Sequence, residues 1–240
     1  MHSPFVFDFI EHVLNDRKQY PVYQEIEQKR NALLRDNRVI VVEDFGAGSL
    51  HHSSFSRKVS RIAATSLKPK KYAQLLFRIV RYFQPASVVE LGTSLGVTTA
   101  YLAAGNPAAN VVSFEGSASI ASIASTHLSL LQPSNVQLIQ GDFNQTLPLF
   151  LANATSIDLV FIDGNHRKSP TLDYFTQCLH RSTDATIMML DDIHWSAEME
   201  AAWEEIKNHP AVTLSIDLFF IGIVFFRKDF KVKQHFAIQF

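Results

Sequence analysis

Hydrophobic residues in the first part of the chain recur at helical spacing. From Tyr72 to Phe83, apolar side chains return every three or four residues, which places them on one face of an amphipathic helix. Residues 3–14 and 20–35 are also predicted to be helices. Residues 36–56 are richer in Gly, Ser, His and Asn, so we expect a loop there. The chain up to residue 85 is therefore predicted to be a helical extension.

From residue 86 the pattern changes to short apolar runs that alternate with helical segments. This alternation is typical of a parallel sheet with crossover helices. Helices are expected near residues 96–104, 117–131, 143–152, 168–180 and 196–207. The predicted strands are Ser87–Leu91, Asn110–Glu115, Val136–Gln140, Ile157–Asp163 and Ala185–Asp191.

The last two apolar runs differ from the others because almost no residues join them. Ala211–Asp217 is followed directly by Phe219–Arg227, which leaves no room for a crossover helix. The final strand must therefore run antiparallel beside its predecessor. We predict an α/β fold in residues 86–240: a Rossmann-like, doubly wound, mostly parallel sheet of seven strands with an antiparallel last strand. Residues 1–85 precede it as the helical extension.

Composition and charge narrow the class of protein. The 22 basic residues nearly cancel the 23 acidic ones, so net charge gives no reason to expect nucleic acid or an anionic membrane as a partner. A single cysteine, Cys178, excludes an internal disulfide and fits a reducing compartment. The first residues do not look like a signal peptide, and Val212–Phe226 is too short to span a bilayer. We expect a cytoplasmic protein, and a homo-oligomer is compatible with the sequence.

The first candidate ligand-binding residues lie where the first predicted strand turns into its helix. Glu90, Gly92, Thr93, Ser94 and Gly96 lie there, at the edge where open α/β sheets bind ligands. Glycine lets the backbone approach a bound molecule closely. The spacing Gly-x-x-x-Gly differs from the Gly-x-Gly-x-x-Gly of dinucleotide-binding proteins, which disfavours a nicotinamide cofactor. A turn that binds no ligand is the alternative interpretation.

Acidic residues end the next two predicted strands. Glu115 and Gly116 end the second one, about 20 residues after the glycines, where a carboxylate can accept hydrogen bonds from both hydroxyls of a ribose. Asp142 and Phe143 end the third strand. An acid at a strand end is by itself more often solvated. Three such features at three successive strand ends favour a nucleoside cofactor.

A second segment competes with this assignment. Val39–Gly48 also looks like a strand that enters a glycine-rich turn. The residues that follow it, His51–Ser56, are a poor start for a packed helix, and no strand ending in an acid comes about 20 residues later. We therefore assign residues 43–56 to a loop or lid over the site.

The fourth and fifth predicted strands deliver more acids. Asp163 ends the fourth, and Asp191 and Asp192 end the fifth. Three carboxylates that lie close together repel one another unless a cation or protons neutralise them, and oxygen ligands suit Mg²⁺, Mn²⁺ or Ca²⁺. His166 follows Asp163 and can accept a proton at neutral pH. In the alternative, Asp163 caps the next helix, and the other two acids bind cofactor or acceptor directly.

His194 and Trp195 follow the fifth strand and are candidates to line an acceptor pocket, with Trp195 stacking on a planar substrate. Equally, Trp195 precedes Ser196, a good N-cap, and can simply pack at the start of the next helix. A set of basic residues in the extension is interpreted as a solvated helical face, which would otherwise attract an anionic acceptor. These residues are Arg57, Lys58, Arg61, Lys68, Lys70 and Lys71.

The five βα units, the terminal hairpin and the motifs at Glu90–Gly96, Glu115 and Asp142 together resemble the class I S-adenosylmethionine-dependent methyltransferases, over about residues 86–227. The resemblance implies that Glu90 helps to orient the methionine end of the cofactor. Glu115 would bind the ribose and Asp142 the adenine, with Phe143 covering the ring. Asp163 would lie beside the transferred methyl group.

The acids at the fourth and fifth strands resemble the metal site of the catechol and caffeoyl-coenzyme A O-methyltransferases, where Asp, Asp and Asn hold a divalent cation. Asp192 stands where that family has Asn, and His166 stands where it has a catalytic Lys. The resemblance implies O-methylation of a small-molecule acceptor, with a metal at Asp163, Asp191 and Asp192 and with His166 as base. A nicotinamide-dependent oxidoreductase and a non-catalytic binding module of the same fold are the alternatives.

Overall fold

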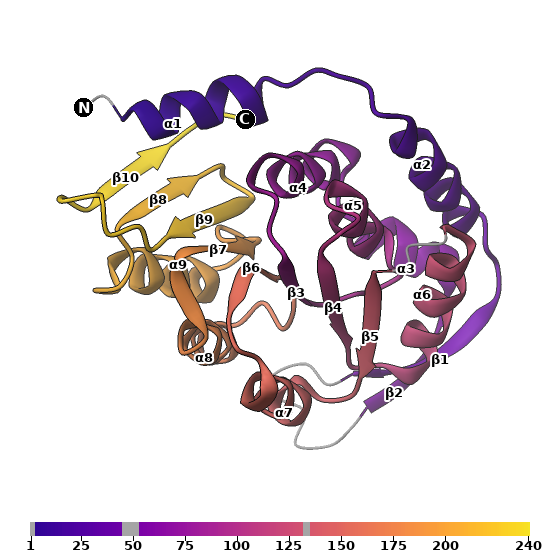
Figure 1. The fold of residues 1–240 in the computed structure, drawn as a ribbon. Coiled ribbons are helices and arrows are strands. Elements are labelled where there is room, and N and C mark those ends of the chain that lie inside the picture. The colour runs from indigo at the N-terminus through magenta and orange to yellow at the C-terminus, as the bar shows by residue number, and fades with distance from the viewer. Residues whose placement is uncertain (1–2, 45–52, 132–134) are drawn as a thin grey trace.

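The centre of the molecule is an eight-stranded sheet (Figure 1). The computed structural model describes residues 3–44, 53–131 and 135–240. The strands of this sheet are β3 (Ser87–Leu91), β4 (Asn110–Glu115), β5 (Val136–Gln140), β6 (Ile157–Ile162), β7 (Ser182–Asp191), β8 (Leu214–Asp217), β9 (Ile221–Phe225) and β10 (Gln234–Ala237). They lie in the order β10-β8-β9-β7-β6-β3-β4-β5. Within this sheet β9 runs antiparallel to both of its neighbours, and the other neighbouring pairs are parallel.

Helices cover both faces of the sheet (Figure 1). One face is covered by α1 (Pro4–Phe9), the π-helical turn η1 (Ile10–Leu14), α4 (Lys70–Phe83) and α5 (Val97–Gly105). The other face is covered by α7 (Phe143–Asn153), α8 (Lys168–Leu179) and α9 (Ala197–Asn208). A third cluster joins α4 and α5 to α2 (Pro21–Leu34), α3 (Val59–Ser66) and α6 (Ala118–Leu131).

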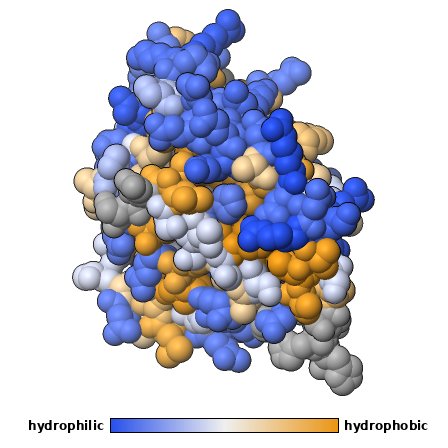
Figure 2. Space-filling view, turned by 90° about the vertical axis from the view of Figure 1, so that its right-hand side faces the viewer, coloured by the Kyte–Doolittle hydropathy of each residue, from blue (hydrophilic) through white to orange (hydrophobic). Residues whose placement is uncertain are grey.

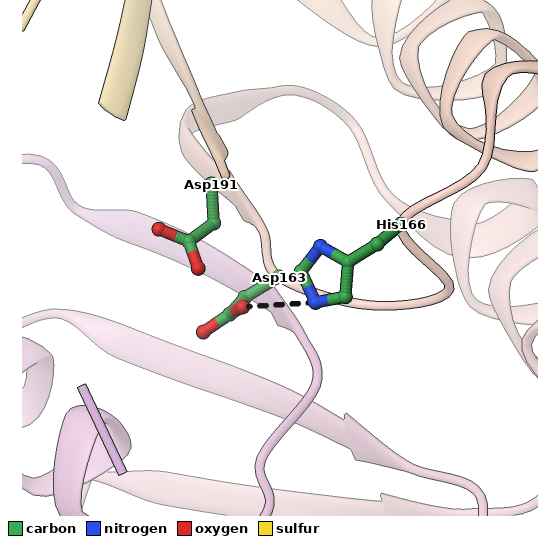
Figure 3. Close-up of side chains that lie close together, drawn as sticks. All are labelled: Asp163, His166 and Asp191. Atoms are coloured by element: carbon green, nitrogen blue, oxygen red, sulfur yellow. Dashed lines mark ion pairs between the residues drawn. The ribbon is translucent and has the colours of Figure 1, made fainter. Parts of the chain in front are cut away.

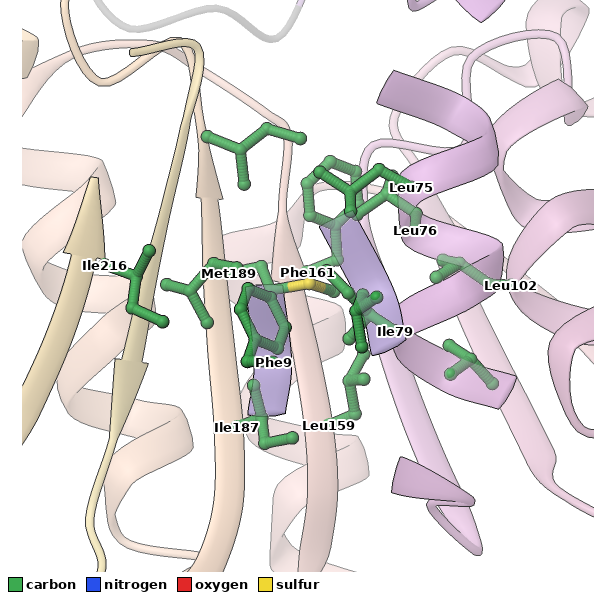
Figure 4. Close-up of a cluster of buried hydrophobic side chains, with 14 of the residues drawn as sticks. Phe9, Leu75, Leu76, Ile79, Leu102, Leu159, Phe161, Ile187, Met189 and Ile216 are labelled. Atoms are coloured by element: carbon green, nitrogen blue, oxygen red, sulfur yellow. The ribbon is translucent and has the colours of Figure 1, made fainter. Parts of the chain in front are cut away.

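The strands are apolar on both sides because both faces of the sheet are buried. In β6, Leu159 and Phe161 point to the α4 and α5 side, whereas Val160 and Ile162 point to the α7 and α8 side, as the two-residue period of a strand requires. Figure 4 shows the first of these clusters, where Phe9 and side chains of α4 pack against the strands. This packing explains the continuous apolar runs that predicted the strands, and it confirms the predicted fold class.

Most of the described part of residues 36–56 is not the loop that we expected. Val39–Asp44 (β1) and Ser53–Lys58 (β2) pair as an antiparallel hairpin. The run from Val39 to Val42 is β-branched and favours extended backbone, and Val42 is buried against the helices of the extension. The sequence showed the strand-like character of Val39–Gly48, but we assigned residues 43–56 to a loop because of their polar composition and of the residues that follow. The glycine-rich turn of the competing motif lies in residues 45–52, outside the described residues.

The C-terminal residues add a strand that we did not predict. Strand β10 pairs in parallel with β8 and extends the sheet beyond the predicted β8 and β9 hairpin. Its side chains alternate between half-buried and exposed, but four residues are too few for a clear period-two signal. The seven predicted strands therefore form the sheet as expected, with β10 as an extra edge.

The outer surface is mixed. The side that carries α2, α6 and the hairpin, on the right in Figure 1, has a hydrophilic upper part and hydrophobic patches across its middle and lower parts (Figure 2). Val39 and Val41 of β1 and Leu130 of α6 are exposed. Of the helices that the structure describes, none combines the length and the apolar character needed to cross a bilayer.

Candidate active site

A cavity of about 970 Å³ opens at the carboxyl ends of the central parallel strands. Gly92, Glu115, Asp163 and Asp191 line it from the ends of β3, β4, β6 and β7. The wall opposite the sheet comes from the N-terminal extension, through β1, β2 and the segment between α3 and α4. This edge is where open α/β sheets bind ligands, and residues of the extension complete the lining of the cavity.

The turn after β3 is shaped by a close approach of two loops. A Cβ atom at Gly92 would lie 2.2 Å from the carbonyl oxygen of Asp163, and the φ angle of Gly92 is +111°. Only glycine fits both conditions. The backbone N–H groups of Gly92 and Thr93 donate to the carbonyl oxygen of Phe114 at 3.0 Å each, which ties the turn to β4. The turn therefore brings the ends of β3, β4 and β6 together at the floor of the cavity.

Glu115 is held in place by backbone donors. Its Oε2 accepts a hydrogen bond from the N–H of Ser94 at 2.8 Å, and its Oε1 accepts one from the N–H of Ser117 at 2.9 Å. Burial raises the pKa of Glu115, and these backbone hydrogen bonds oppose the shift. Each carboxylate oxygen has a second acceptor position. Glu115 lines the cavity and so can offer both oxygens to a ligand.

Glu90 lies beneath the turn and is fully buried. Its Oε2 accepts hydrogen bonds from the hydroxyls of Thr99 and Ser113, both at 2.5 Å. Its Oε1 is buried with no hydrogen-bond partner among the described residues. Burial raises the pKa of Glu90 to about 7. A buried acceptor without a donor is costly, so Oε1 marks a place where a donor from a bound cofactor would be stabilising.

Asp142 and Phe143 lie at the far end of the cavity, which both of them line. Asp142 is the N-cap of α7 and accepts a hydrogen bond from the N–H of Asn144 at 2.9 Å. The Phe143 ring packs against Tyr174, with 5.9 Å between the ring centroids. The capping role of Asp142 and a ligand-binding role are compatible, because the cap uses one carboxylate oxygen and leaves the other.

Asp163, His166 and Asp191 converge on one point (Figure 3). Each offers a candidate ligand atom, and these atoms lie within 4.8 Å of one another. His166 Nε2 lies 3.7 Å from Asp163 Oδ1. Asp192 lines the cavity but is not part of this cluster. Asn165, His166 and Asp192 all have positive φ angles, a strained backbone that concentrates at functional sites in non-glycine residues.

A lysine that we interpreted as solvated lies in the middle of this cluster. The side chain of Lys68 is only 8% exposed, and its Nζ lies 3.4 Å from Asp163 Oδ2 and in direct contact with Asp191 Oδ2. Helical spacing did not apply to it, because Lys68 lies in the extended linker between α3 and α4. The following Pro69 was the available signal, since the residue before a proline disfavours helix.

The positive charge of the Lys68 ammonium group compensates the negative charge of Asp163 and Asp191. Burial disfavours its charge, but the carboxylates of Asp163, Asp191 and Asp192 outweigh that effect and raise the pKa of Lys68. Burial and the neighbouring Asp163 raise the pKa of Asp191 to about 7, while Lys68 opposes the shift. Burial likewise raises the pKa of Asp163. Lys68 is therefore charged, and it stabilises acids that would otherwise repel each other.

The residues present do not fit the divalent cation that the resemblance implied. Mg²⁺ or Ca²⁺ would need oxygen ligands at roughly 2.0–2.6 Å, and one oxygen of each carboxylate, Oδ2 of Asp163 and Oδ2 of Asp191, is already paired with the Lys68 ammonium. A second positive charge at that distance would be strongly repelled in a buried site. The third expected ligand, Asp192, also lies outside the cluster.

His194 and Trp195 lie in different surroundings. His194 Nε2 lies 2.9 Å from Oδ2 of Asp217, at the end of β8. The same oxygen accepts a hydrogen bond from the indole N–H of Trp203, on α9, at 3.1 Å. His194 therefore takes part in the packing of α9 against β8. Trp195 lines the cavity and is 74% exposed. Ser196 caps α9 by accepting a hydrogen bond from the N–H of Met199. Trp195 is thus available to a ligand.

Comparisons with known proteins agree with this geometry. Residues 89–193 match the family model described as a methyltransferase domain. The comparison with curated proteins gives no match.

Solved structures share the fold across almost the whole chain. An O-methyltransferase from Bacillus cereus, in complex with S-adenosylhomocysteine, is 20% identical with a TM-score of 0.61, over 92% of this chain and 97% of that one. A methyltransferase from Podospora anserina, bound to S-adenosylhomocysteine, is 13% identical with a TM-score of 0.65, over 95% and 98%. The O-methyltransferase TomG from Streptomyces achromogenes, in complex with S-adenosylmethionine, is 15% identical with a TM-score of 0.61, over 95% and 100%. The chain therefore has the fold of these methyltransferases, and residues 89–193 are similar to the methyltransferase domain family.

Proposed function

We propose that the protein transfers a methyl group from S-adenosylmethionine to an oxygen of a small-molecule acceptor. The observation that carries this proposal is the Glu115 carboxylate, which two backbone N–H groups hold at the end of β4 inside the cavity. It stands beside the Gly92 turn, in a domain that matches methyltransferases. The solved relatives named above were crystallised with this cofactor or its demethylated product.

The sheet side of the cavity provides the cofactor half. Glu115 would accept hydrogen bonds from the ribose hydroxyls, and Gly116 follows it at the strand end. Asp142 and Phe143 would contact the adenine. In the turn after β3, Gly92 and Ser94 line the cavity and would approach the cofactor with their backbone, whereas Thr93 and Gly96, which the sequence also suggested, are not among the lining residues. Glu90, whose Oε1 is buried and unpaired, lies beneath the turn and outside the cavity lining, so it would orient the methionine end only if cofactor binding brings a donor to it.

The extension side of the cavity provides the acceptor half. Tyr72 and Arg57 line it from the extension, and the loops that face the extension add the aromatic rings of Trp195 and Phe220 and the positive charge of Arg167. This lining suits a flat or partly apolar acceptor that carries an anionic group. The finer identity of the acceptor depends on this half, because the extension is not part of the matched domain.

The chemistry requires deprotonation and alignment. S-adenosylmethionine, when bound, supplies a methyl group on a positively charged sulfur. The acceptor hydroxyl must lose its proton, and His166 lies at the cavity wall with Asp163 3.7 Å away to orient it. Holding the acceptor oxygen in line with the methyl group supplies much of the rate enhancement in such a reaction. We therefore assign the role of general base to His166.

Isothermal titration calorimetry with S-adenosylhomocysteine tests the proposal. We expect saturable binding to the wild-type protein, and no change in NADH fluorescence when NADH is added in its place. Absence of S-adenosylhomocysteine binding would refute the proposed function. Transfer of radiolabelled methyl groups to a panel of hydroxylated small molecules then identifies the acceptor and separates an enzyme from a non-catalytic binding module.

We also propose that the protein works in the cytoplasm. The single cysteine, Cys178, is a buried free thiol, and burial raises its pKa to about 12. A fold without a disulfide among its described residues suits a reducing compartment.

A further inference from the structure

The position of Lys68 is the feature that the proposed function does not explain. The lysine comes from the linker between α3 and α4, outside the matched domain, and reaches the ends of β6 and β7. Its side chain is almost fully buried, and its Nζ contacts one carboxylate from each of these strands. Burying an ammonium group is costly unless it is paired, so a solvated role does not account for this placement.

The linker is built to hold the lysine there. Pro69 follows Lys68 and fixes the start of α4. The carbonyl oxygen of Lys68 accepts a hydrogen bond from Arg30 Nη1 of α2 at 2.8 Å. The ring of Phe161 lies 5.5 Å from Nζ and provides an apolar, electron-rich floor. The backbone and the ring therefore position the ammonium group before any ligand binds.

We propose that Lys68 is the cation of this active site: it takes the place of a divalent metal between Asp163 and Asp191 and donates a hydrogen bond to the acceptor oxygen. The inference rests on the proposed function for its acceptor. An ammonium group has three N–H donors. The two carboxylates use two of them, and Lys68 lines the cavity, so the third can reach a ligand.

In this arrangement the reaction moves one proton and one methyl group. The acceptor hydroxyl gives its proton to His166, and its oxygen forms a bond to the methyl carbon as the bond between that carbon and sulfur breaks. The electron pair of the broken bond stays on sulfur, which becomes neutral. Lys68 keeps its protons throughout and stabilises the negative charge that develops on the acceptor oxygen, as a preorganised donor does. His166 releases its proton to solvent afterwards.

Whether the cluster binds a metal should depend on Lys68. While Lys68 is present, one oxygen of Asp163 and one of Asp191 are paired with its ammonium group. Removing that group would leave two carboxylates and His166 with ligand atoms within 4.8 Å, a set that suits Mn²⁺. The Lys68→Ala variant should therefore gain a metal site that the wild-type protein does not offer.

Thermal unfolding with and without Mn²⁺ tests this inference, with Mg²⁺ and Ca²⁺ as further probes. The proteins are wild type, Lys68→Ala, Lys68→Ala/Asp191→Asn, and Lys70→Ala as matched control, because Lys70 is exposed two residues away. Excess Mn²⁺ should raise the midpoint of Lys68→Ala by about 5 °C. It should leave the midpoints of wild type, the double variant and Lys70→Ala unchanged.

Two results would overturn the inference. One is stabilisation of the wild-type protein by a divalent ion that is lost in Asp191→Asn, since the cation would then be a metal. The other is a folded Lys68→Ala variant that gains no metal binding, since Lys68 would then not stand in a cation's place. If Lys68→Ala does not fold, the wild-type titration alone decides. Calorimetry with S-adenosylhomocysteine on the wild-type protein tests the proposed function separately, so the two failures are distinguishable.

Discussion

Replacing Glu115 by Gln is the sharpest test of the cofactor half of the site. The two side chains have nearly the same shape, so the substitution removes charge and acceptor capacity without opening a cavity. Glu115 uses one oxygen for the N–H of Ser94 and the other for the N–H of Ser117. In the Glu115→Gln variant the amide NH₂ cannot accept, so one of these two backbone donors loses its partner.

The loss of affinity can be worked from these contacts. The carboxylate would offer one charge-assisted hydrogen bond to each ribose hydroxyl, and bonds to charged groups contribute about 1.5–3 kcal/mol each. The amide side chain of the variant keeps only one neutral acceptor. We therefore expect a loss of about 3 kcal/mol in binding, which corresponds to on the order of 100-fold weaker affinity for S-adenosylhomocysteine.

Isothermal titration calorimetry measures this change, with circular dichroism to verify that the variant is folded. Glu25→Gln is the matched control, because Glu25 is exposed on α2 and far from the cavity lining. Its affinity should equal that of the wild-type protein. A folded Glu115→Gln protein that binds S-adenosylhomocysteine within about threefold of wild type would refute the assignment of the ribose site, because that change is under 1 kcal/mol.

Other parts of the site give three further predictions. Gly92→Ala places a Cβ atom 2.2 Å from a carbonyl oxygen at a φ of +111°, so urea denaturation should show a loss of about 4 kcal/mol in the free energy of unfolding; an unchanged midpoint would contradict the geometry. Burial raises the pKa of Glu90 from 4.5 to about 7, so its stabilising contribution is full below pH 4.5 and is lost as the pH rises to 7. Between pH 4.5 and pH 7 the free energy of unfolding of the wild-type protein, measured by urea denaturation, should fall by about 3 kcal/mol more than that of Glu90→Gln. If the free energies of the two proteins change in parallel with pH, the pKa of Glu90 is not raised. Trp195 is exposed at the cavity whereas Trp203 is buried, so an acceptor that binds beside Trp195 should change the tryptophan fluorescence, and Trp195→Phe should abolish that change.

The sequence was sufficient to predict the sheet and the residues at its carboxyl edge. Short continuous apolar runs located β3 to β7, and the rule that ligands bind at the carboxyl ends of parallel strands then predicted that Glu115, Asp142, Asp163 and Asp191 line one cavity, as they do. These residues follow strands directly, so local pattern and topology together determine where they lie.

Contacts between distant segments were not predictable in the same way. Lys68 meets Asp163 and Asp191 only because the extension folds over the sheet edge, and no period in the sequence encodes that approach. His194 likewise pairs with Asp217, from the following strand. The hairpin of β1 and β2 was missed because residues 36–56 were assigned to a loop on their polar composition, and β10 was missed because four residues carry little periodic signal.

Lys68 lies outside residues 89–193, so the segment that matches the methyltransferase family depends on the N-terminal extension for the charge that balances Asp163 and Asp191. A fragment that begins at residue 86 would lack both this counter-charge and the part of the cavity wall that the extension supplies. In the full chain, where the acids stay buried, removing the Lys68 charge alone costs about 3–5 kcal/mol. Exchanging the N-terminal segment between such proteins would therefore change the charge balance of the active site as well as the acceptor half of the cavity. If Lys68 stands in the place of a metal as proposed, exchanging the few residues of its linker would exchange the need for a metal as well.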